Sequence, residues 1–316
     1  MELFADNYKQ AQDTGASTCR GIALLQGTSV RYTRTDRPYL TGTLRSGTLA
    51  LPFKVWEGDL YYKLTAEGYS LDATHNVSAK LDSYGGSPQL ILTGAEMMEG
   101  ISADSVVPVK YDSGLLDKMF ATMSQVAPDE VATLFQSVLT GASIERFSRE
   151  YAGVRMHDAV PSGLLGHSFK TFRLMLALMQ WYPSIFNHLD SRDDSNVYHN
   201  SKYIPLFVTG IHDLGKIWEY SDGELSELAW ASHRVLLNEY LTTNFKDELE
   251  SVFGTQGYLR ILSAVAQHHG EYEERPRTIE GYLVHLVDNM ETSVTQLCEG
   301  IDVNPSNIAV GGFHLS

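Results

Sequence analysis

The sequence lacks long apolar runs, closely spaced cysteines and an excess of positive charge, and each absence excludes a class of protein. No apolar run approaches the roughly 20 residues that span a bilayer, and the first residues, MELFADNYKQ, are acidic and polar rather than basic and then apolar. We therefore expect a cytoplasmic protein without a membrane partner. The two cysteines, Cys19 and Cys298, lie far apart, which argues against a disulfide framework and against a zinc ribbon.

Basic residues are few, because 39 Asp and Glu residues against 24 Lys and Arg residues give a formal net charge of −15. Such a charge argues against a surface that coats duplex nucleic acid indiscriminately. Residues 1–100 are nearly balanced, with 9 basic and 11 acidic residues, and they contain a run of arginines interrupted by one aspartate: Arg20, Arg31, Arg34, Arg37 and Arg45. This run predicts either a locally positive face or a strand edge that is protected by charge.

The first third of the chain has the pattern of short strands. Apolar stretches alternate with Gly, Pro and Asp turn residues, so we expect strands at residues 20–32, 37–44, 48–56, 76–84 and 88–98. Residues 61–75 are expected to be an irregular connection. Five short strands favour a small barrel like the OB-fold, which is the five-stranded barrel that binds oligonucleotides.

After residue 101 the apolar residues recur at spacings of three and four, which is the period of a helix. Helices are predicted at residues 114–126, 129–141, 144–153, 162–182, 201–219, 226–243, 256–269 and 277–298, with a polar loop at residues 187–201. The predicted fold class is α+β and multidomain. It comprises an OB-like barrel at residues 1–100, a helical connector at 101–160, an all-α domain at 161–300 and a tail at 301–316.

Seven histidines and aspartates lie inside these apolar helical segments, where an unpaired polar side chain would be costly to bury. They are His167, His212, Asp213, His233, His268, His269 and Asp288. Imidazole and carboxylate without thiolate is a ligand set of Mn, Fe, Zn or Mg, so this pattern predicts a metal site. The other histidines, His75, His157, His188, His199 and His285, are expected to be ordinary hydrogen-bonded core residues.

Adjacent residues on a helix project about 100° apart, so His212 and Asp213 can converge only on a metal that lies against their helix. If Asp213 uses both carboxylate oxygens, it can serve two metals. Lys216 returns to the same side of the helix three residues later, where its ammonium group could hold a phosphate oxygen.

The segments GLLGHSF, GIHDLGKIWEY, SHRVLLNEY, HHGEYEERPRT and LVHLVDNMET resemble the HD-domain metal-dependent phosphohydrolase superfamily. With a barrel in front, essentially the whole chain resembles the YhaM-type 3′-to-5′ exoribonucleases. The resemblance implies hydrolysis of single-stranded RNA, or also single-stranded DNA, to nucleoside monophosphates. It implies one or two Mn²⁺ ions, with Fe²⁺, Mg²⁺, Zn²⁺ and Co²⁺ as alternatives. The family pattern carries over to His167, His212, Asp213 and Asp288 as core ligands, with His233, His268 and His269 around a second metal.

In this interpretation Asp213 and Lys216 are the catalytic residues, the first by bridging the metals and the second by stabilising negative charge in the transition state. The barrel would bind the strand through Arg31, Arg34, Arg37, Arg45, Tyr39 and Trp56. Core packing is the alternative for the aromatic positions, which also include Tyr32, Phe53 and Tyr84. Two other functions stay open: a phosphodiesterase or phosphatase for cyclic or small nucleotides, and a non-catalytic single-strand-binding protein. A homo-oligomer is open as well.

Overall fold

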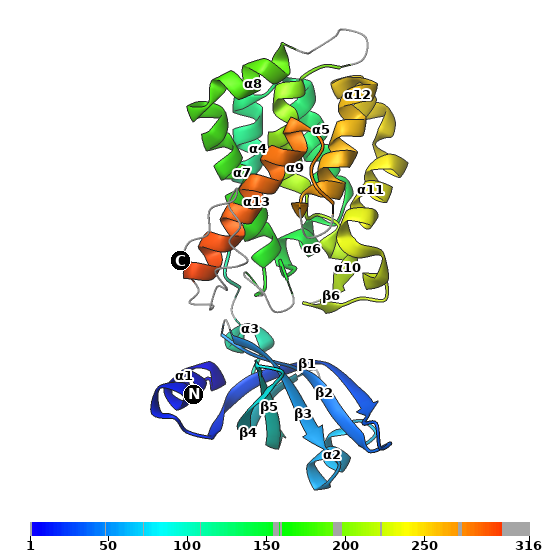
Figure 1. The fold of residues 1–316 in the computed structure, drawn as a ribbon. Helices are drawn as coiled ribbons and strands as arrows, with labels where there is room; N and C mark the ends of the chain where they lie inside the picture. The colour runs from blue at the N-terminus through cyan, green and yellow to red at the C-terminus, as the bar shows by residue number, and fades with distance from the viewer. Residues whose placement is uncertain are drawn as a thin grey trace. The chain divides into compact units, whose positions relative to one another are not determined.

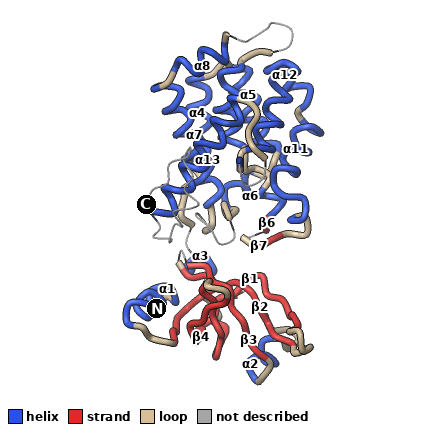
Figure 2. The backbone as a smooth tube through the Cα atoms, in the orientation of Figure 1, coloured by secondary structure: helices blue, strands red, loops and turns tan. Residues whose placement is uncertain are grey.

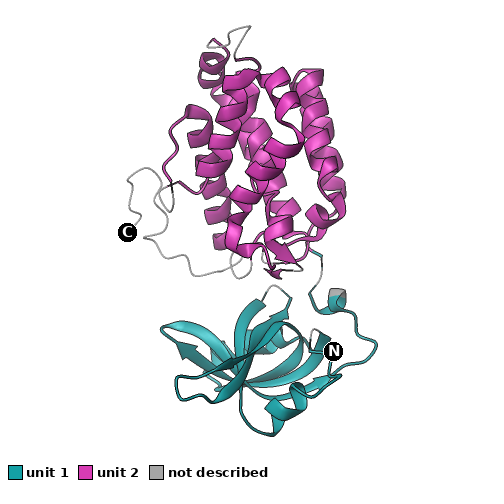
Figure 3. Ribbon diagram, turned by 90° about the vertical axis from the view of Figure 1, so that its right-hand side faces the viewer, with its two compact units in different colours: residues 1–109 teal, residues 110–316 magenta. Residues whose placement is uncertain are grey.

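The computed structural model describes residues 2–47, 49–71, 73–107, 109–153, 158, 160–191, 198–221, 223–270 and 274–298. The chain divides into two compact units, residues 1–109 and residues 110–316 (Figure 3). The predicted tail at residues 301–316 and His157 lie outside the described residues. Among the helices that are described, none combines the length and the apolar character needed to cross a membrane.

Unit 1 contains a closed five-stranded barrel (Figure 1). Its strands are β1 (Thr18–Tyr32), β2 (Pro38–Ser46), β3 (Leu49–Trp56), β4 (Ala73–Tyr84) and β5 (Ser87–Met97). They follow the order β1-β2-β3-β5-β4, and the pairing of β1 with β4 closes the barrel. All pairings are antiparallel except that of β3 with β5. The prediction of a five-stranded barrel is therefore confirmed.

The barrel is specified by alternation and by turn chemistry. In β3, Phe53 and Val55 are buried while Trp56 is exposed, because successive side chains point to opposite faces of a strand. Between β4 and β5, Gly85 and Gly86 both have positive φ angles, of 60° and 84°. A two-residue hairpin whose turn follows the twist of the strands requires this conformation, and glycine adopts it without strain.

Three helices of unit 1 were not predicted: α1 (Phe4–Thr14), α2 (Asp59–Leu64) and α3 (Ala103–Val106). Helix α2 lies in the region that was expected to be irregular, and it buries Tyr61 and Leu64. Helix α1 buries Phe4, Tyr8 and Ala11, whose spacing of four and three residues was a readable signal. A few apolar contacts to the barrel thus stabilise helices that are too short to be stable alone.

The described residues of unit 2 are helical apart from loops and one small hairpin (Figure 2). Its first helices are α4 (Gly114–Val126), α5 (Asp129–Gly141), α6 (Ile144–Arg149), α7 (Gly163–Trp181) and α8 (Pro183–Asp190). The following elements are η1 (Ser201–Tyr203), α9 (Ile204–Ile211), α10 (Lys216–Glu219), β6 (Tyr220–Ser221), β7 (Glu224–Leu225) and η2 (Ala229–Ala231). The last helices are α11 (Ser232–Asn244), α12 (Lys246–Gln267) and α13 (Ile279–Cys298).

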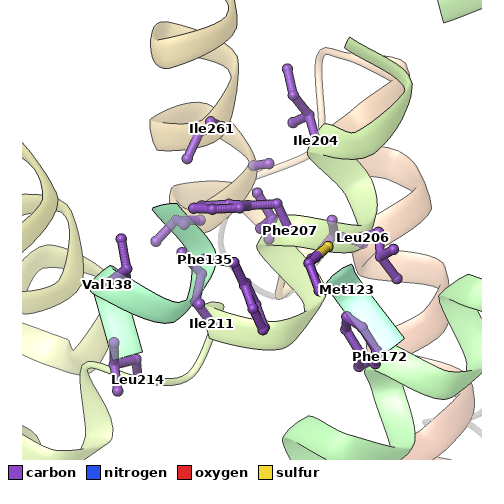
Figure 4. Close-up of a cluster of buried hydrophobic side chains, with 14 of the residues drawn as sticks. Met123, Phe135, Val138, Phe172, Ile204, Leu206, Phe207, Ile211, Leu214 and Ile261 are labelled. Carbon is purple, nitrogen blue, oxygen red and sulfur yellow. The ribbon is translucent and has the colours of Figure 1, made fainter. Parts of the chain in front are cut away.

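The core of unit 2 is built around α9, the helix that ends at the HD pair (Figure 4). The ring of Phe135 on α5 lies 5.8 Å from that of Phe172 on α7 and 5.8 Å from that of Phe207 on α9. Phe207 in turn lies 5.3 Å from Phe253 on α12. Helix α5 is therefore an integral part of the core of unit 2, which begins at Lys110. Dense packing of this kind resists displacement and gives the site a rigid base.

The predicted helix at residues 201–219 is interrupted. Helix α9 ends at Ile211, residues 212–215 form turns, and α10 begins at Lys216. Close packing requires glycine in these turns, because a Cβ atom on Gly215 would lie 1.9 Å from the carbonyl oxygen of His233. The turns place His212 and Asp213 at the end of a helix instead of within one.

Other boundaries differ from the prediction as well. The helix predicted at residues 226–243 begins only at Ser232, after η2, and the one predicted at 144–153 ends at Arg149. Helix α8 occupies the start of the predicted polar loop, and Pro183 in its first turn was an available helix-start signal. Helix α12 begins already at Lys246 and bends at Gly254, which has a φ of 73°. The bend breaks the apolar period, which is why only the part after it was predicted.

Candidate metal centre

All seven predicted ligands gather in unit 2. They come from α7, from the turn after α9, from α11, from the end of α12 and from α13. Their ligand atoms form two groups that could each hold a metal ion, with the atoms of a group within 4.8 Å of one another. The first group is His167, His212 and Asp288, and the second group is Asp213, His233, His268 and His269.

The first group also faces one oxygen of Asp213. Nε2 of His167 lies 3.1 Å from Oδ1 of Asp288 and 3.2 Å from Nε2 of His212. Oδ2 of Asp213 lies 3.4 Å from Nε2 of His167 and 3.5 Å from Nε2 of His212. Bonds of about 2.1 Å to one cation place neighbouring ligand atoms about 3.0 Å apart in octahedral and about 3.4 Å apart in tetrahedral geometry. The observed spacings therefore fit a single divalent cation.

The second group is centred on the other oxygen of Asp213. Oδ1 of Asp213 lies 3.4 Å from Nε2 of His233 and 3.5 Å from Nε2 of His268. These three atoms are buried and have no hydrogen-bond partner within the described parts of the chain. Because a buried polar atom without a partner costs the full desolvation penalty, their convergence fits a cation between them. Asp213 thus directs one carboxylate oxygen to each group.

Four of the histidines are anchored in the same way, with Nδ1 bound to an acceptor and Nε2 left for the centre. Two of them donate to backbone carbonyls: Nδ1 of His212 to Thr209 (3.1 Å) and Nδ1 of His268 to Val265 (2.7 Å). The other two donate to carboxylates: Nδ1 of His233 to Oε2 of Glu219 (2.7 Å) and Nδ1 of His167 to Oε2 of Glu291 (2.5 Å). A carbonyl can only accept, so the bond fixes the tautomer that metal ligation requires. Glu219 and Glu291 were not predicted, although Glu291 lies three residues after Asp288, on the same helix face.

Burial and charge give the two groups different protonation. Burial lowers the pKa of His268 to about 4 and that of His269 to about 3, so both rings are neutral at pH 7. Burial also opposes a charge on His167, but the carboxylates of Asp288 and Glu291 outweigh it and raise the pKa of His167 to about 10. Without metal the first group therefore holds a proton, and the second group does not.

Lys216 is buried beside Asp213. Its Nζ lies 2.7 Å from Oδ2 of Asp213 and donates to the carbonyl of Ala152 at 2.6 Å. Within the described residues, two of the three ammonium donors thus have acceptors. Burial tends to raise the pKa of the Asp213 carboxyl, but the charge of Lys216 outweighs it and holds this pKa well below its usual range. Lys216 fixes the orientation of Asp213, and its contact with a phosphate stays a prediction.

A third cluster, Asp158 with His167 and Glu291, has the spacing of a metal site but not the charge. Nζ of Lys170 lies 2.7 Å from Oδ2 of Asp158 and is also paired with Glu291. Nζ of Lys110 lies 2.8 Å from Oδ1 of Asp158. Two ammonium groups already neutralise the two carboxylates, so this cluster supports the centre without being a cation site.

The predicted strand-binding residues of unit 1 mostly share one face of the barrel. Arg31 on β1 pairs with Tyr39 on β2, and Tyr39 pairs with Trp56 on β3. Arg34 and Arg37 lie in the exposed turn between β1 and β2. We call the set Arg31, Arg34, Arg37, Tyr39, Lys54, Trp56 and Tyr84 the β1–β3 surface.

Lys54 was missed, although it lies two residues before Trp56 and thus on the same face of β3. Its Nζ lies 4.9 Å from the ring centroid of Tyr84, 5.6 Å from that of Trp56 and 5.8 Å from that of Tyr39. Trp56 is 46% exposed and Tyr84 is 75% exposed. An exposed group of three aromatic rings around a cation is suited to stacking on flat, anionic ligands.

Two sequence-based assignments need correction, and one alternative is confirmed. Arg45 is only 1% exposed, so it cannot belong to a basic surface. It pairs with Leu24, which packs with Val106 and Val107 and not in the barrel core. For Phe53 the core-packing alternative is confirmed, because the ring is fully buried in the barrel core. His188 is exposed on α8 rather than in the core, whereas His75 and His285 donate Nδ1 to the backbone carbonyls of Ala73 and His268.

Comparison of the chain with protein-family models, with curated proteins and with solved structures found no match. The geometry of the two ligand groups is therefore the basis for assigning a function.

The protonation of His167 leads to a measurable prediction about metal binding. A cation at the first group must displace the His167 proton, so binding at pH 7 should release about one proton, and affinity should rise about tenfold per pH unit up to about pH 10. The second group should bind with little pH dependence above pH 6, because His268 and His269 are already neutral. Calorimetric Mn²⁺ titrations in buffers of different ionisation enthalpy measure the proton count. An affinity of the first group for Mn²⁺ that stays constant from pH 6 to pH 8 would contradict the assignment.

Proposed function

We propose that this protein is a metal-dependent phosphodiesterase that removes nucleotides from the 3′ end of single-stranded RNA or DNA. The observation that carries the proposal is Asp213, whose two carboxylate oxygens face two separate groups of histidines. Two cations that share a carboxylate are typical of enzymes that hydrolyse phosphate esters. The resemblance of the HD segments to a phosphohydrolase superfamily supports the same reaction.

The first group would hold one cation and the second group the other. Imidazole and carboxylate ligands without thiolate favour Mn²⁺ or Fe²⁺ over a structural zinc site. When bound, such a pair supplies Lewis acidity to the phosphoryl group and lowers the pKa of a water molecule.

The residues of the chain hold the metal ligands in position and exclude bulk water from the centre. Asp213 is held by Lys216, and four histidines are held by their Nδ1 acceptors, so the ligands are in place before substrate arrives. His167, His212 and His268 are almost fully buried, which excludes bulk water and strengthens the attraction between the centre and a phosphate. The positive charge of Lys216, which is paired with Oδ2 of Asp213, adds to that attraction.

The β1–β3 surface favours a strand over a small nucleotide as the substrate. A cyclic nucleotide has one base and one phosphate and makes no use of a separate barrel, whereas a strand can stack bases on exposed rings for about 1–3 kcal/mol each with little sequence preference. The test of the proposal is hydrolysis of a strand with a free 3′ end beside a 3′-blocked strand and a cyclic nucleotide.

We expect the loss of the arginines on the β1–β3 surface to weaken strand binding without changing the hydrolysis of a small ester. Replacing Arg31, Arg34 and Arg37 by glutamine should weaken binding of a long single strand and reduce the salt slope by about 0.7 for each lost phosphate contact. Hydrolysis of bis-p-nitrophenyl phosphate should stay unchanged, because this small ester needs only the metal centre. Filter binding between 50 and 300 mM salt measures the slope.

A matched control removes three exposed cations elsewhere in unit 1: Lys9, Arg20 and Lys80, each replaced by glutamine. The control should bind strands much as the parent does. The variant of Arg31, Arg34 and Arg37 could instead bind strands as tightly as the parent at every salt concentration. This result would show that these arginines do not bind the substrate, and it would favour the small-nucleotide alternative.

A further inference from the structure

The segment that begins unit 2 lies against the helix of a predicted metal ligand. The backbone N–H of Tyr111 donates to Oγ of Ser162 at 2.8 Å, and its hydroxyl donates to Oδ1 of Asp158 at 2.7 Å. Its ring covers Gly166, where a Cβ atom would lie 2.2 Å from the ring. His167 is the next residue, so the ring of Tyr111 sits on the backbone that carries this ligand.

A line of paired charges continues from the same segment to the imidazole, with the carboxylates buried and the two lysine side chains 31% and 29% exposed. Nζ of Lys110 lies 2.8 Å from Oδ1 of Asp158, and the other oxygen of Asp158 lies 2.7 Å from Nζ of Lys170. Lys170 is paired with Oε1 of Glu291, whose Oε2 accepts from Nδ1 of His167 at 2.5 Å. Positive and negative groups thus alternate along an unbroken path from Lys110 to His167.

Each link of this path depends on the next. Charge-assisted hydrogen bonds to a buried carboxylate are strong, and a carboxylate that loses one partner draws more strongly on the partner that remains. Without Lys110 and the Tyr111 hydroxyl, Oδ1 of Asp158 loses both of these donors, so Lys170 is drawn toward Asp158 and away from Glu291. Glu291 is then less constrained, and so is the ring of His167.

The second group has no part in this path. His233 is anchored by Glu219, and His268 is anchored by the carbonyl of Val265. A disturbance at the start of unit 2 should therefore reach one group of ligands and spare the other.

We propose that Lys110 and Tyr111 are positioning residues for His167, and that they set the affinity of the first group for its cation. The inference rests on the proposed metal centre. Since unit 1 ends at Val109, the same two residues also carry the covalent link from the barrel.

The experiment measures Mn²⁺ affinity one group at a time. In a background with His233 and His269 replaced by alanine, titration reports the first group, and in a His167→Ala background it reports the second. Lys110→Met combined with Tyr111→Phe should weaken Mn²⁺ at the first group about tenfold, and Glu291→Gln should weaken it by about 10- to 100-fold, the range for outer partners of metal ligands. Affinity at the second group should not change. Lys110→Arg in place of Lys110→Met should restore most of the Mn²⁺ affinity that the first group loses.

Lys118→Met, which removes an exposed cation from α4, serves as the matched control, and thermal unfolding of the metal-free proteins reports the fold. An unchanged affinity at the first group overturns the inference. So does an equal loss at both groups with a lowered unfolding temperature, because this is the result of a merely structural role. If the parent protein binds no Mn²⁺, the proposed centre itself is wrong and the inference falls with it.

Discussion

Replacing Asp213 by asparagine is expected to abolish the hydrolysis of both strands and small esters, with a loss of about a thousandfold or more. The change removes the negative charge that both groups share and places an amide N–H where one cation needs an oxygen. We expect the variant to lose both metal ions, whereas Asp288→Asn, which affects only the first group, should lose one. Elemental analysis of protein from Mn-supplemented cultures measures this difference.

The fold of this variant needs its own control. Asp213→Asn leaves Lys216 buried without its partner carboxylate, and an unpaired buried charge costs about 3–5 kcal/mol. The double variant Asp213→Asn with Lys216→Met removes the charge as well, so it should regain stability without regaining metal or activity. Asp190→Asn, in a partly exposed ion pair with Lys202, is the matched control and should keep both.

Binding of single strands should survive the loss of Asp213, because the β1–β3 surface belongs to the other unit. A variant that still holds two ions, or that hydrolyses bis-p-nitrophenyl phosphate at more than a tenth of the parent rate, would show that Asp213 does not bridge the groups.

The second large effect concerns which end of a strand is attacked. A single strand with a free 3′ hydroxyl should be shortened stepwise to nucleoside monophosphates, whereas a 3′-blocked strand, a circular strand and a duplex should resist. The direction of attack follows from the resemblance to the YhaM-type exoribonucleases.

Strands labelled at the 5′ end, incubated with the Mn²⁺-loaded protein and separated on a denaturing gel, give the test. A ladder that shortens from the labelled side, or cuts in the circular strand, would refute the 3′-to-5′ assignment while leaving phosphodiester hydrolysis intact. Turnover of a cyclic nucleotide faster than of any strand would favour the small-nucleotide alternative.

Local pattern was enough for several parts of the fold. Helices α4 and α5 begin and end at the predicted residues, because their apolar period and the Pro128 before α5 act within a few turns of helix. The five strands were predictable because alternation and paired glycines are also local signals. The seven candidate ligands were recognisable by residue type alone, since histidine and aspartate are expensive to bury without a partner.

Interactions between distant elements were not readable in this way. Glu291 is 124 positions from His167, and Glu219 is an ordinary helical glutamate until α11 places His233 against it. Arg45 stands among basic residues in the sequence, yet it is buried in the folded unit. The need for glycine at position 215 depends on the approach of the His233 carbonyl.

By itself the sequence determined which residue types are available: an acidic chain, a barrel followed by helices, and seven side chains suited to a divalent cation. Only the tertiary structure decided how they divide, with His167, His212 and Asp288 on one side of Asp213 and three histidines on the other. The physical reason is the number of residues over which each kind of interaction acts. Periodicity and turn chemistry act over a few residues, whereas the direction of each Asp213 oxygen depends on five elements that meet only when the core around α9 has packed.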